Sequence, residues 1–291
     1  MKQTLQKALQ SSWIIIKLVI PIYILADILY YYNALSYIAF IVEPFTSILG
    51  LPTEASLAII SGIFLNLYAA VAFAAPLDMD TQQWSILAIF LGVCHSLIVE
   101  SMILKKLGVS NIYSYSLRFF GGLIIAFSAT FLPNNLFNST IQTQISEKEI
   151  YSSIEQLLTN SFLNASILTI KIILLITTLI FIMDYIKNMN FIKNSAKNIS
   201  KSFSIIVGIF LGITYGAGIL VNEANNLKKS DLFFIATFLM ICHAIIEDTL
   251  LFVIFGADFT IVVVVRTLWA IVLAYLFTNI YKGRYGERNK I

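Results

Sequence analysis

Long apolar segments recur along the whole chain, and short polar stretches separate them. About 20 apolar residues in a helix are enough to cross the ~30 Å hydrocarbon core of a bilayer. Eight segments reach this length, at residues 13–32, 54–75, 84–107, 113–132, 163–186, 203–222, 231–255 and 258–281. The pattern predicts an all-α polytopic membrane protein with four spans in each half of the chain.

Two further stretches do not fit a regular span. Residues 38–50 are apolar but short, are interrupted by Glu43 and Pro44, and end at Gly50. This composition predicts a re-entrant or interfacial hairpin, because helix breakers and charge are costly in a helix that faces lipid. The corresponding stretch of the second half, residues 187–202, is rich in lysine and is predicted to be amphipathic.

A polar linker at residues 133–162 separates a first repeat, residues 1–132, from a second repeat, residues 163–291. The linker holds three Glu and one Lys, which is typical of a non-cytoplasmic loop, whereas both termini and the lysine-rich stretch are basic. These charges favour inverted repeats, in which the two halves cross the membrane in opposite senses. Parallel repeats remain open.

A repeated set of polar residues supports two related halves. The first set is Cys94, His95, Glu100, Ser101, Gly108 and Arg118, and the second is Cys242, His243, Asp248, Thr249, Gly256 and Arg266. Each residue of the second set follows its counterpart by 148 positions, and together the sets contain both histidines and both cysteines of the chain. Such matched placement favours a tandem duplication.

Composition agrees with the membrane class. Hydrophobic residues make up 58% of the chain and charged residues 12%, which excludes a soluble domain because so few charges could not cover its surface. The net charge of +3 is too small to indicate nucleic-acid binding. Cys94 and Cys242 lie in apolar surroundings, where buried, reduced thiols are expected rather than a disulfide.

The spacing of charges predicts a buried ion pair in each half. Glu100 lies eight residues before Gly108, which is ~12 Å along a helix at 1.5 Å per residue. Arg118 follows the same turn at nearly the same depth, and the equivalent spacing pairs Asp248 with Arg266. Each pair is either a structural link between two helices or part of a polar site that changes partners during transport.

His95 and His243 fall near the middles of their spans. At equivalent repeat positions they would approach each other across a pseudo-two-fold axis, where an imidazole can carry a proton, bind a cation or contact a solute. The simpler interpretation is that each histidine is a hydrogen-bonded residue of the protein core. His243 and Glu247 share a helix face at i, i+4, so His243, Glu247 and His95 are weak candidates for a metal site, although Val99 replaces the acid in the first copy.

Three other stretches interrupt the apolar pattern. Thr53 is a predicted N-cap for a helix that includes Glu54, and the amide groups there form either an anion site or a capped helix end. The amide of Asn66 needs a partner at its depth in the second span. Residues 212–218, which include Tyr215, are glycine-rich, and this favours close helix packing or a discontinuous helix.

At these residues the chain resembles the nucleoside-recognition, or Gate-domain, family of bacterial membrane proteins. The segment GLPTEASLAIISGIFLNLYAAVAF followed by CHSLIVE resembles one Gate unit, and LGITYGAGILVNEA followed by CHAIIEDTLLFVIFGAD resembles a second. Relatives include the spore-maturation membrane proteins A and B, Gate segments of ferrous-iron transporters and, more distantly, concentrative nucleoside transporters. The resemblance implies a multi-pass protein of the bacterial inner membrane, and it suggests roles for Glu54, Asn66, Asn222 and Glu223.

We therefore expect a transporter or permease for a small polar solute, which is nucleoside-like, a small anion or a small cation, with its site at the repeat interface near the midplane. The residues expected to bind solute or to gate this site are His95, His243, Glu100, Arg118, Asp248, Arg266, Glu247, Glu54, Asn66, Tyr215, Asn222 and Glu223. No cofactor is expected, and a coupling ion would be a proton or sodium. The bilayer and the solute are the expected partners, and homo-oligomers are compatible with the sequence.

Two other classes of function remain as alternatives. The chain contains no G-x-S-x-G, phosphate-binding loop, cysteine cluster or H-E-x-x-H, so we do not expect an enzyme. The second hypothesis is a non-transporting scaffold or assembly factor of the envelope, in which the charged pairs are purely structural. A membrane-embedded enzyme is the third.

Overall fold

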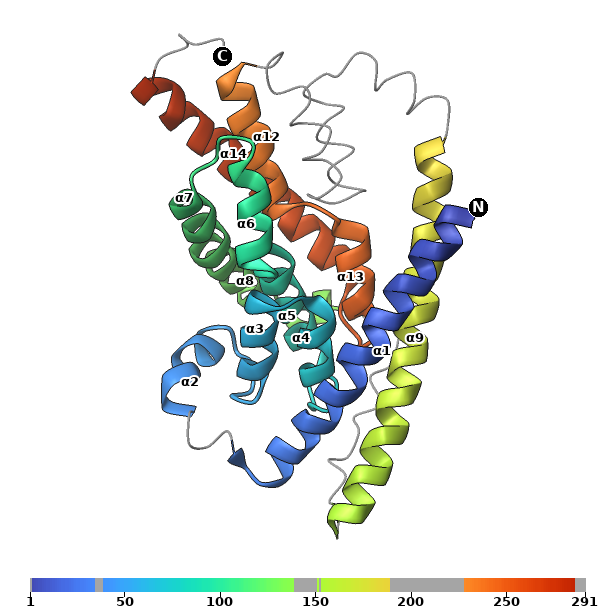
Figure 1. Ribbon diagram of the computed structural model, residues 1–291. Helices are drawn as coiled ribbons and strands as arrows, with labels where there is room; N and C mark the ends of the chain where they lie inside the picture. Colours follow the sequence, from blue (N-terminus) through green and yellow to red (C-terminus); the bar gives the residue numbers. More distant parts are fainter. Residues whose placement is uncertain (1, 35–38, 139–150, 152, 189–227, 286–291) are drawn as a thin grey trace.

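A computed structural model of the chain describes residues 2–34, 39–138, 151, 153–188 and 228–285 (Figure 1). All regular secondary structure in these ranges is helical. The helical stretches there that are long and apolar enough to cross a membrane are Thr4–Tyr31, Thr81–Lys105, Asn111–Thr130, Ile154–Ile182, Lys229–Val253 and Phe259–Gly283. The predicted all-α polytopic class is confirmed. The span predicted at 203–222, and all but the first two residues of the amphipathic stretch 187–202, lie outside the described ranges.

Short helices dominate the first half of the chain and longer ones the second. The first half holds α1 (Lys2–Tyr31), α2 (Ala39–Ile48), α3 (Ala55–Phe64), α4 (Leu67–Ala74), α5 (Thr81–Cys94), α6 (Leu97–Lys105), α7 (Asn111–Ser116), the π-helical turn η2 (Leu117–Gly121), α8 (Gly122–Thr130) and the 3-10 turn η3 (Asn134–Leu136). The second half holds α9 (Ile154–Asn188), α12 (Lys229–Ile241), α13 (Ile245–Val253) and α14 (Phe259–Tyr285).

Three of the predicted spans are not continuous helices. The chain leaves the helical conformation between α3 and α4, between α5 and α6, and between α12 and α13. At the last two breaks Ser96 and Ala244 adopt left-handed backbone conformations, with φ of 46° and 43°. At the first break Asn66 is extended, and its side-chain Oδ1 accepts a hydrogen bond (3.0 Å) from the amide of Ala69. The candidate spans Thr81–Lys105 and Lys229–Val253 run through their breaks, whereas the span predicted at 54–75 is divided into two short helices at Asn66, a residue that already interrupts the apolar pattern.

The stretch predicted to be a hairpin is also different. Residues 39–48 form one helix, α2, and the chain then turns at Gly50 (φ 65°) into α3, against which α2 packs. The predicted Thr53 cap is wrong, because α3 begins at Ala55 and Glu54 occupies the cap position without a side-chain hydrogen bond. The amides of residues 55–57 bond instead to the carbonyls three positions earlier, which removes the basis for an anion site at this helix start.

The helices α1 and α9 lie side by side in opposite directions (Figure 1). Thr4 donates a hydrogen bond to Asp184 (2.8 Å) near one end of the pair, and Ser161 donates one to Asp27 (2.5 Å) near the other. Ser161 follows Thr4 by 157 positions, and Asp184 follows Asp27 by the same number. The two bonds therefore join equivalent residues reciprocally, as helices related by a two-fold axis do.

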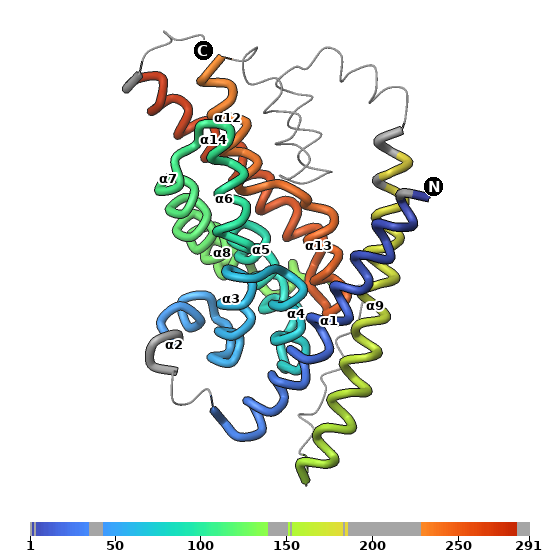
Figure 2. Tube along the Cα trace, viewed as in Figure 1, coloured from blue at the N-terminus to red at the C-terminus, as the bar shows by residue number. Residues whose placement is uncertain are grey.

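Two helical hairpins carry the repeated polar residues: the first hairpin comprises α5 to α8 and the second comprises α12 to α14. Their matched elements also run in opposite directions. In Figure 2 the trace ascends through α5 and α6 and descends through α12 and α13. The bounds of α6 and α13 correspond at the 148-residue offset. The antiparallel course agrees with inverted repeats for these elements. Counterparts of α2–α4 would fall in residues that the structure does not describe, so the arrangement of the complete halves stays a prediction.

Candidate functional site

The two helix breaks hold both histidine rings in the same local orientation. His95 directly follows the end of α5, and its Nδ1 lies 2.8 Å from the carbonyl oxygen of Leu91. His243 follows the end of α12, and its Nδ1 lies 2.8 Å from the carbonyl oxygen of Leu239. The reversed backbone at the next residue then ends each helix. Each ring is thus fixed through Nδ1 and presents Nε2 away from its own helix.

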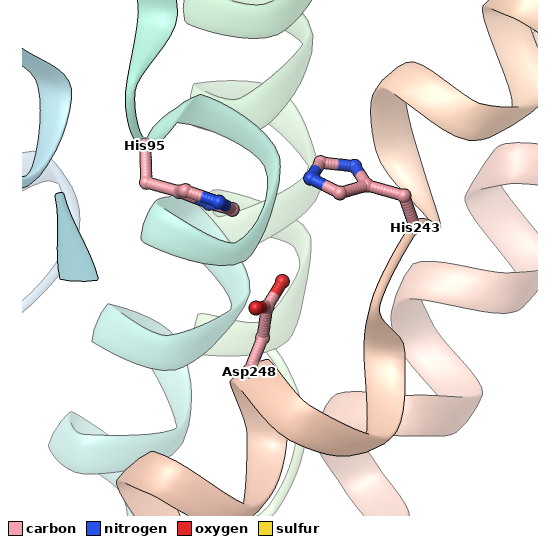
Figure 3. Close-up of side chains that lie close together, drawn as sticks. All are labelled: His95, His243 and Asp248. Carbon is pink, nitrogen blue, oxygen red and sulfur yellow. The ribbon is translucent and has the colours of Figure 1, made fainter. Parts of the chain in front are cut away.

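The rings meet between the two hairpins, as predicted. Their centroids are 5.3 Å apart with an interplanar angle of 37°. Figure 3 shows them projecting toward each other from different segments, with the carboxylate of Asp248 directed toward the space between them. His95 is 7% exposed and His243 is 2% exposed, so the contact is buried.

Glu100 links both histidines to Arg118. Its Oε2 lies 2.6 Å from Nη2 of Arg118, so the predicted ion pair is present. Its Oε1 lies 3.1 Å from Nε2 of His95, and its Oε2 lies 3.3 Å from Nε2 of His243. The bridge to His243 joins the first hairpin to the second, and the sequence did not reveal it.

Both arginines also bind the carbonyl groups that the helix breaks leave without helical partners. Arg118 donates from Nε to Val93 (2.8 Å) and from Nη2 to His95 (2.6 Å). Arg266 donates equivalently to Ile241 (3.2 Å) and His243 (3.2 Å). Both arginine side chains are fully buried. Each arginine therefore interacts both with a carboxylate and with main-chain carbonyl oxygens that would otherwise be unpaired in an apolar interior.

The second ion pair is looser than the first. Oδ2 of Asp248 lies 3.7 Å from Nη2 of Arg266, which is beyond hydrogen-bonding distance. Asp248 forms a group with His95 and His243 in which one potential metal-ligand atom from each residue lies within 4.8 Å of the others. These are the described residues with the best geometry for a bound cation.

Several buried polar atoms of this cluster make no hydrogen bond within the described residues. Donors without a partner are Nη1 of Arg118 and Nη1 of Arg266, and acceptors include Oδ2 of Asp248. The buried hydroxyl of Thr249, which follows Asp248 in the chain, also makes no hydrogen bond within the described residues. Buried polar atoms are normally paired, and leaving them unpaired costs about 1–3 kcal/mol each. The cluster can therefore accept water, an ion or a polar solute.

The other predicted residues have different positions. The backbone amide and side chain of Ser96 donate to Gly62 and Leu65, so the break that carries Asn66 lies against the break at His95. Glu54 is half-buried at the start of α3. The i, i+4 argument for His243 with Glu247 was wrong, because the helix is interrupted between them. The acid that forms a group with His95 and His243 is the next residue, Asp248. The remaining predicted residues, Tyr215, Asn222 and Glu223, lie outside the described ranges.

Comparison with known proteins supports the membrane assignment. The profile of the Gate family, described as nucleoside recognition, matches residues 12–170, which include the complete first set of histidine, acid and arginine. The chain is 23% identical to the uncharacterized membrane protein YvoD of Bacillus subtilis (strain 168), in an alignment that covers 94% of this chain and 92% of that protein. No solved structure matches. The chain belongs to the Gate, or nucleoside-recognition, family of membrane proteins.

Proposed function

We propose that this protein is a transporter for a small polar solute, and that the solute binds at the cluster of His95, Glu100, His243 and Asp248. One observation carries the proposal. Two histidines, two acids and two arginines converge at breaks in membrane helices and leave buried donors and acceptors unpaired. Ionisable groups are costly inside a membrane, and discontinuous helices are the usual solute sites of secondary transporters.

The balance of charge favours particular solutes. Arg118 and Arg266 carry two positive charges, and Glu100 and Asp248 carry two negative ones, so the cluster is close to neutral when the histidines are uncharged. Among the described residues, Nη1 of each arginine is a donor without a partner, and Oδ2 of Asp248 is an acceptor without one. A molecule with both donors and acceptors, such as a nucleoside or another small neutral polar compound, satisfies both kinds of group. A small acid is the next best candidate.

Transport requires the cluster to open. Its histidines and arginines are almost completely buried, and the side chain of Glu100 is 13% exposed. The helix breaks beside His95 and His243 supply positions at which the short helices α6 and α13 can change direction. We therefore interpret the described conformation as a closed one, in which the two hairpins are in contact.

A membrane scaffold is the second candidate, and it too has an observation in its favour. A scaffold needs its helix breaks to be stabilised. The close Glu100–Arg118 pair and the hydrogen bonds from both arginines to main-chain carbonyls do this without any solute. A scaffold would tolerate replacement of the histidines if the arginines remain. A transporter would not.

A ligand screen tests the proposal. Detergent-purified protein is heated with nucleosides, small acids and divalent cations, since a ligand at 100 times its Kd stabilises the folded state by about 2.7 kcal/mol. Compounds that stabilise it are then assayed for uptake into proteoliposomes. We expect Asp248→Asn and His95→Ala to abolish stabilisation and uptake, whereas Glu155→Gln, a change of an exposed acid on α9, leaves both intact. Uptake unchanged in both cluster variants would contradict the proposed site.

A further inference from the structure

We infer that His95, Glu100 and His243 together hold one exchangeable proton, and that the transport proposed above is coupled to it. The coupling of transport to the proton rests on the proposed function, but the proton site does not. The proton site follows from which atoms of the three side chains face each other. The first step concerns the tautomer of the two rings.

The main chain fixes that tautomer. Nδ1 of His95 and Nδ1 of His243 each lie 2.8 Å from a carbonyl oxygen, and a carbonyl oxygen can only accept a hydrogen bond. Nδ1 therefore carries the hydrogen in both rings. A neutral ring with its hydrogen on Nδ1 has a lone pair on Nε2. Both lone pairs would then be directed at Glu100.

An ionised Glu100 cannot donate to these nitrogens. Its Oε1 lies 3.1 Å from Nε2 of His95, and its Oε2 lies 3.3 Å from Nε2 of His243. A carboxylate presents only lone pairs, so two neutral rings facing it at these distances would give repulsion on both sides. One added proton converts one contact into an N–H···O bond between opposite charges. The geometry of the described conformation therefore calls for a proton on this unit.

The surrounding charges limit the number of protons to one. Arg118 on η2 faces Glu100, and Arg266 on α14 faces Asp248 on α13, where Glu247 is the preceding residue. With these pairs balanced, the first proton gives the cluster a single positive charge. A second would place two imidazolium rings with centroids 5.3 Å apart in a medium of low dielectric constant. The residues that precede the two histidines are the buried cysteines Cys94 and Cys242.

The equivalence of the two rings makes this proton mobile. It forms an N–H bond with Nε2 of either His95 or His243, and the carboxylate of Glu100 lies 3.1 Å or 3.3 Å from that nitrogen as its counter-charge. Exchange breaks one N–H bond and forms another, with water as the final donor or acceptor when the cluster opens. The two histidines thus share one proton between them.

Loss of the proton would also favour opening. Without it, the lone pairs of both rings oppose the carboxylate of Glu100, and this repulsion acts between α6 of the first hairpin and the α12–α13 break of the second. Protonation closes the contact again. The proton therefore biases the same two hairpins that must separate for a solute to enter.

A divalent metal fits the described geometry less well. The candidate ligand atoms of His95, His243 and Asp248 lie up to 4.8 Å apart. Two ligands of one zinc ion at ~2.1 Å are at most ~4.2 Å apart, and closer in a tetrahedron. A dication would also add two charges to a cluster in which each carboxylate already faces an arginine. A proton adds only one charge and needs no movement.

Nitrogen-15 NMR of the protein in lipid bilayers tests the inference directly, because the chain has only two histidines. In protein labelled at histidine we expect Nδ1 of both rings to be protonated at every pH. Between about pH 5 and 8, the Nε2 resonances should move together, with a total change that corresponds to one proton. Glu100→Gln should abolish this movement, since a neutral amide can donate to Nε2, and Glu155→Gln should leave it unchanged.

The same measurement can overturn the inference. Unprotonated Nδ1 in either ring, two independently titrating rings, or neutral rings at all pH values in the wild-type protein would each contradict it. So would a change in both Nε2 resonances on addition of one equivalent of Zn²⁺. None of these outcomes depends on a variant that fails to fold.

Proteoliposomes that contain a pH-sensitive dye separate this inference from the proposed function. We expect each solute from the ligand screen to acidify or alkalinise the lumen as it moves, and we expect Glu100→Gln to abolish that proton movement. Uptake without proton movement would overturn the coupling but leave the transporter. A shared proton seen by NMR in a protein that takes up no compound of the screen would support the proton site and contradict the transport function.

Discussion

Arg266 donates a hydrogen bond of 2.6 Å from Nη2 to the carbonyl oxygen of Gly92, and so the arginine of the second hairpin closes onto the backbone of the first. The approach is close because residue 92 has no side chain. A Cβ at this position would lie 2.5 Å from Nη1 and 2.6 Å from Cζ of Arg266. The contact between the hairpins therefore depends on a glycine as much as on the charged residues.

Gly92→Ala should destabilise the protein because the guanidinium of Arg266 must move from its site. Forcing extra volume into a packed interior costs about 1–3 kcal/mol, and displacement would also weaken the bonds to Ile241 and His243. Thermal unfolding in detergent measures the loss. The matched control is Gly283→Ala, at a helical position where a Cβ meets nothing within 4 Å. Equal stability of the two variants would contradict the close approach.

The meeting of the histidines and the first ion pair were predictable from the sequence, and the reasons are physical. Repeat spacing placed His95 and His243 at equivalent depths, and depth along a helical hairpin paired Glu100 with Arg118. The turn at Gly108 was also predictable, and its φ of 82° is one that glycine adopts without strain.

The helix breaks were not predictable in the same way. Ser96 and Ala244 carry the left-handed conformation, although neither residue type signals it, and the residues that follow them, Leu97 and Ile245, are apolar. Tertiary bonds sustain the breaks, since the arginines bind the freed carbonyls from residues more than 20 positions away. The role of Arg118 and Arg266 as partners of the main chain was missed for that reason.

Ala244→Gly should stabilise the protein or leave its stability unchanged. A left-handed conformation costs a residue with a Cβ about 1–2 kcal/mol, and glycine removes that cost while losing about 0.5–1 kcal/mol through its greater freedom in the unfolded chain. The control is Ala126→Gly in α8, a buried helical position where the same change should destabilise by about 1 kcal/mol or more. Thermal unfolding of both variants checks the difference. Comparable destabilisation at the two positions would show that Ala244 is not left-handed.

The two ion pairs should differ in strength. Glu100→Gln leaves Arg118 buried without its counter-charge, which costs about 3–5 kcal/mol. Asp248→Asn should cost less, because Asp248 and Arg266 are 3.7 Å apart, compared with 2.6 Å in the first pair. Double-mutant cycles that add Arg118→Met or Arg266→Met measure each coupling by unfolding. A larger coupling for the second pair would contradict the described distances.

The reciprocal bonds between α1 and α9 should also be unequal. Ser161→Ala removes a buried donor to Asp27, and a hydrogen bond to a charged group is worth about 1.5–3 kcal/mol. Thr4→Val removes the equivalent donor to Asp184, which is only partly buried, so its cost should be smaller. Ser166→Ala, on the same helix, removes only a bond to a carbonyl one turn away and should change stability by less than about 0.5 kcal/mol. Unfolding of the three variants should reproduce this order.

Inverted repeats make a topological prediction that chemical labelling can test. The bond from the amide of Asn138 to Asp258 places the loop between α13 and α14 beside the chain that follows α8. A cysteine at exposed Thr260 should therefore react with a membrane-impermeant maleimide from the same side as one at exposed Asn135, and from the side opposite to one at exposed Lys106.

The native thiols do not interfere with this experiment, because Cys94 and Cys242 are both buried and wild-type protein should remain unlabelled. Asn135 and Lys106 lie at opposite ends of the helical segment that contains α7, η2 and α8, so they calibrate the two sides. Parallel repeats would instead place Thr260 on the side of Lys106, since its sequence counterpart at the 148-residue offset is Ile112, directly after the loop between α6 and α7. Labelling of Thr260→Cys together with Lys106→Cys would exclude inverted repeats, and with them the pseudo-two-fold relationship on which the equivalence of His95 and His243 depends.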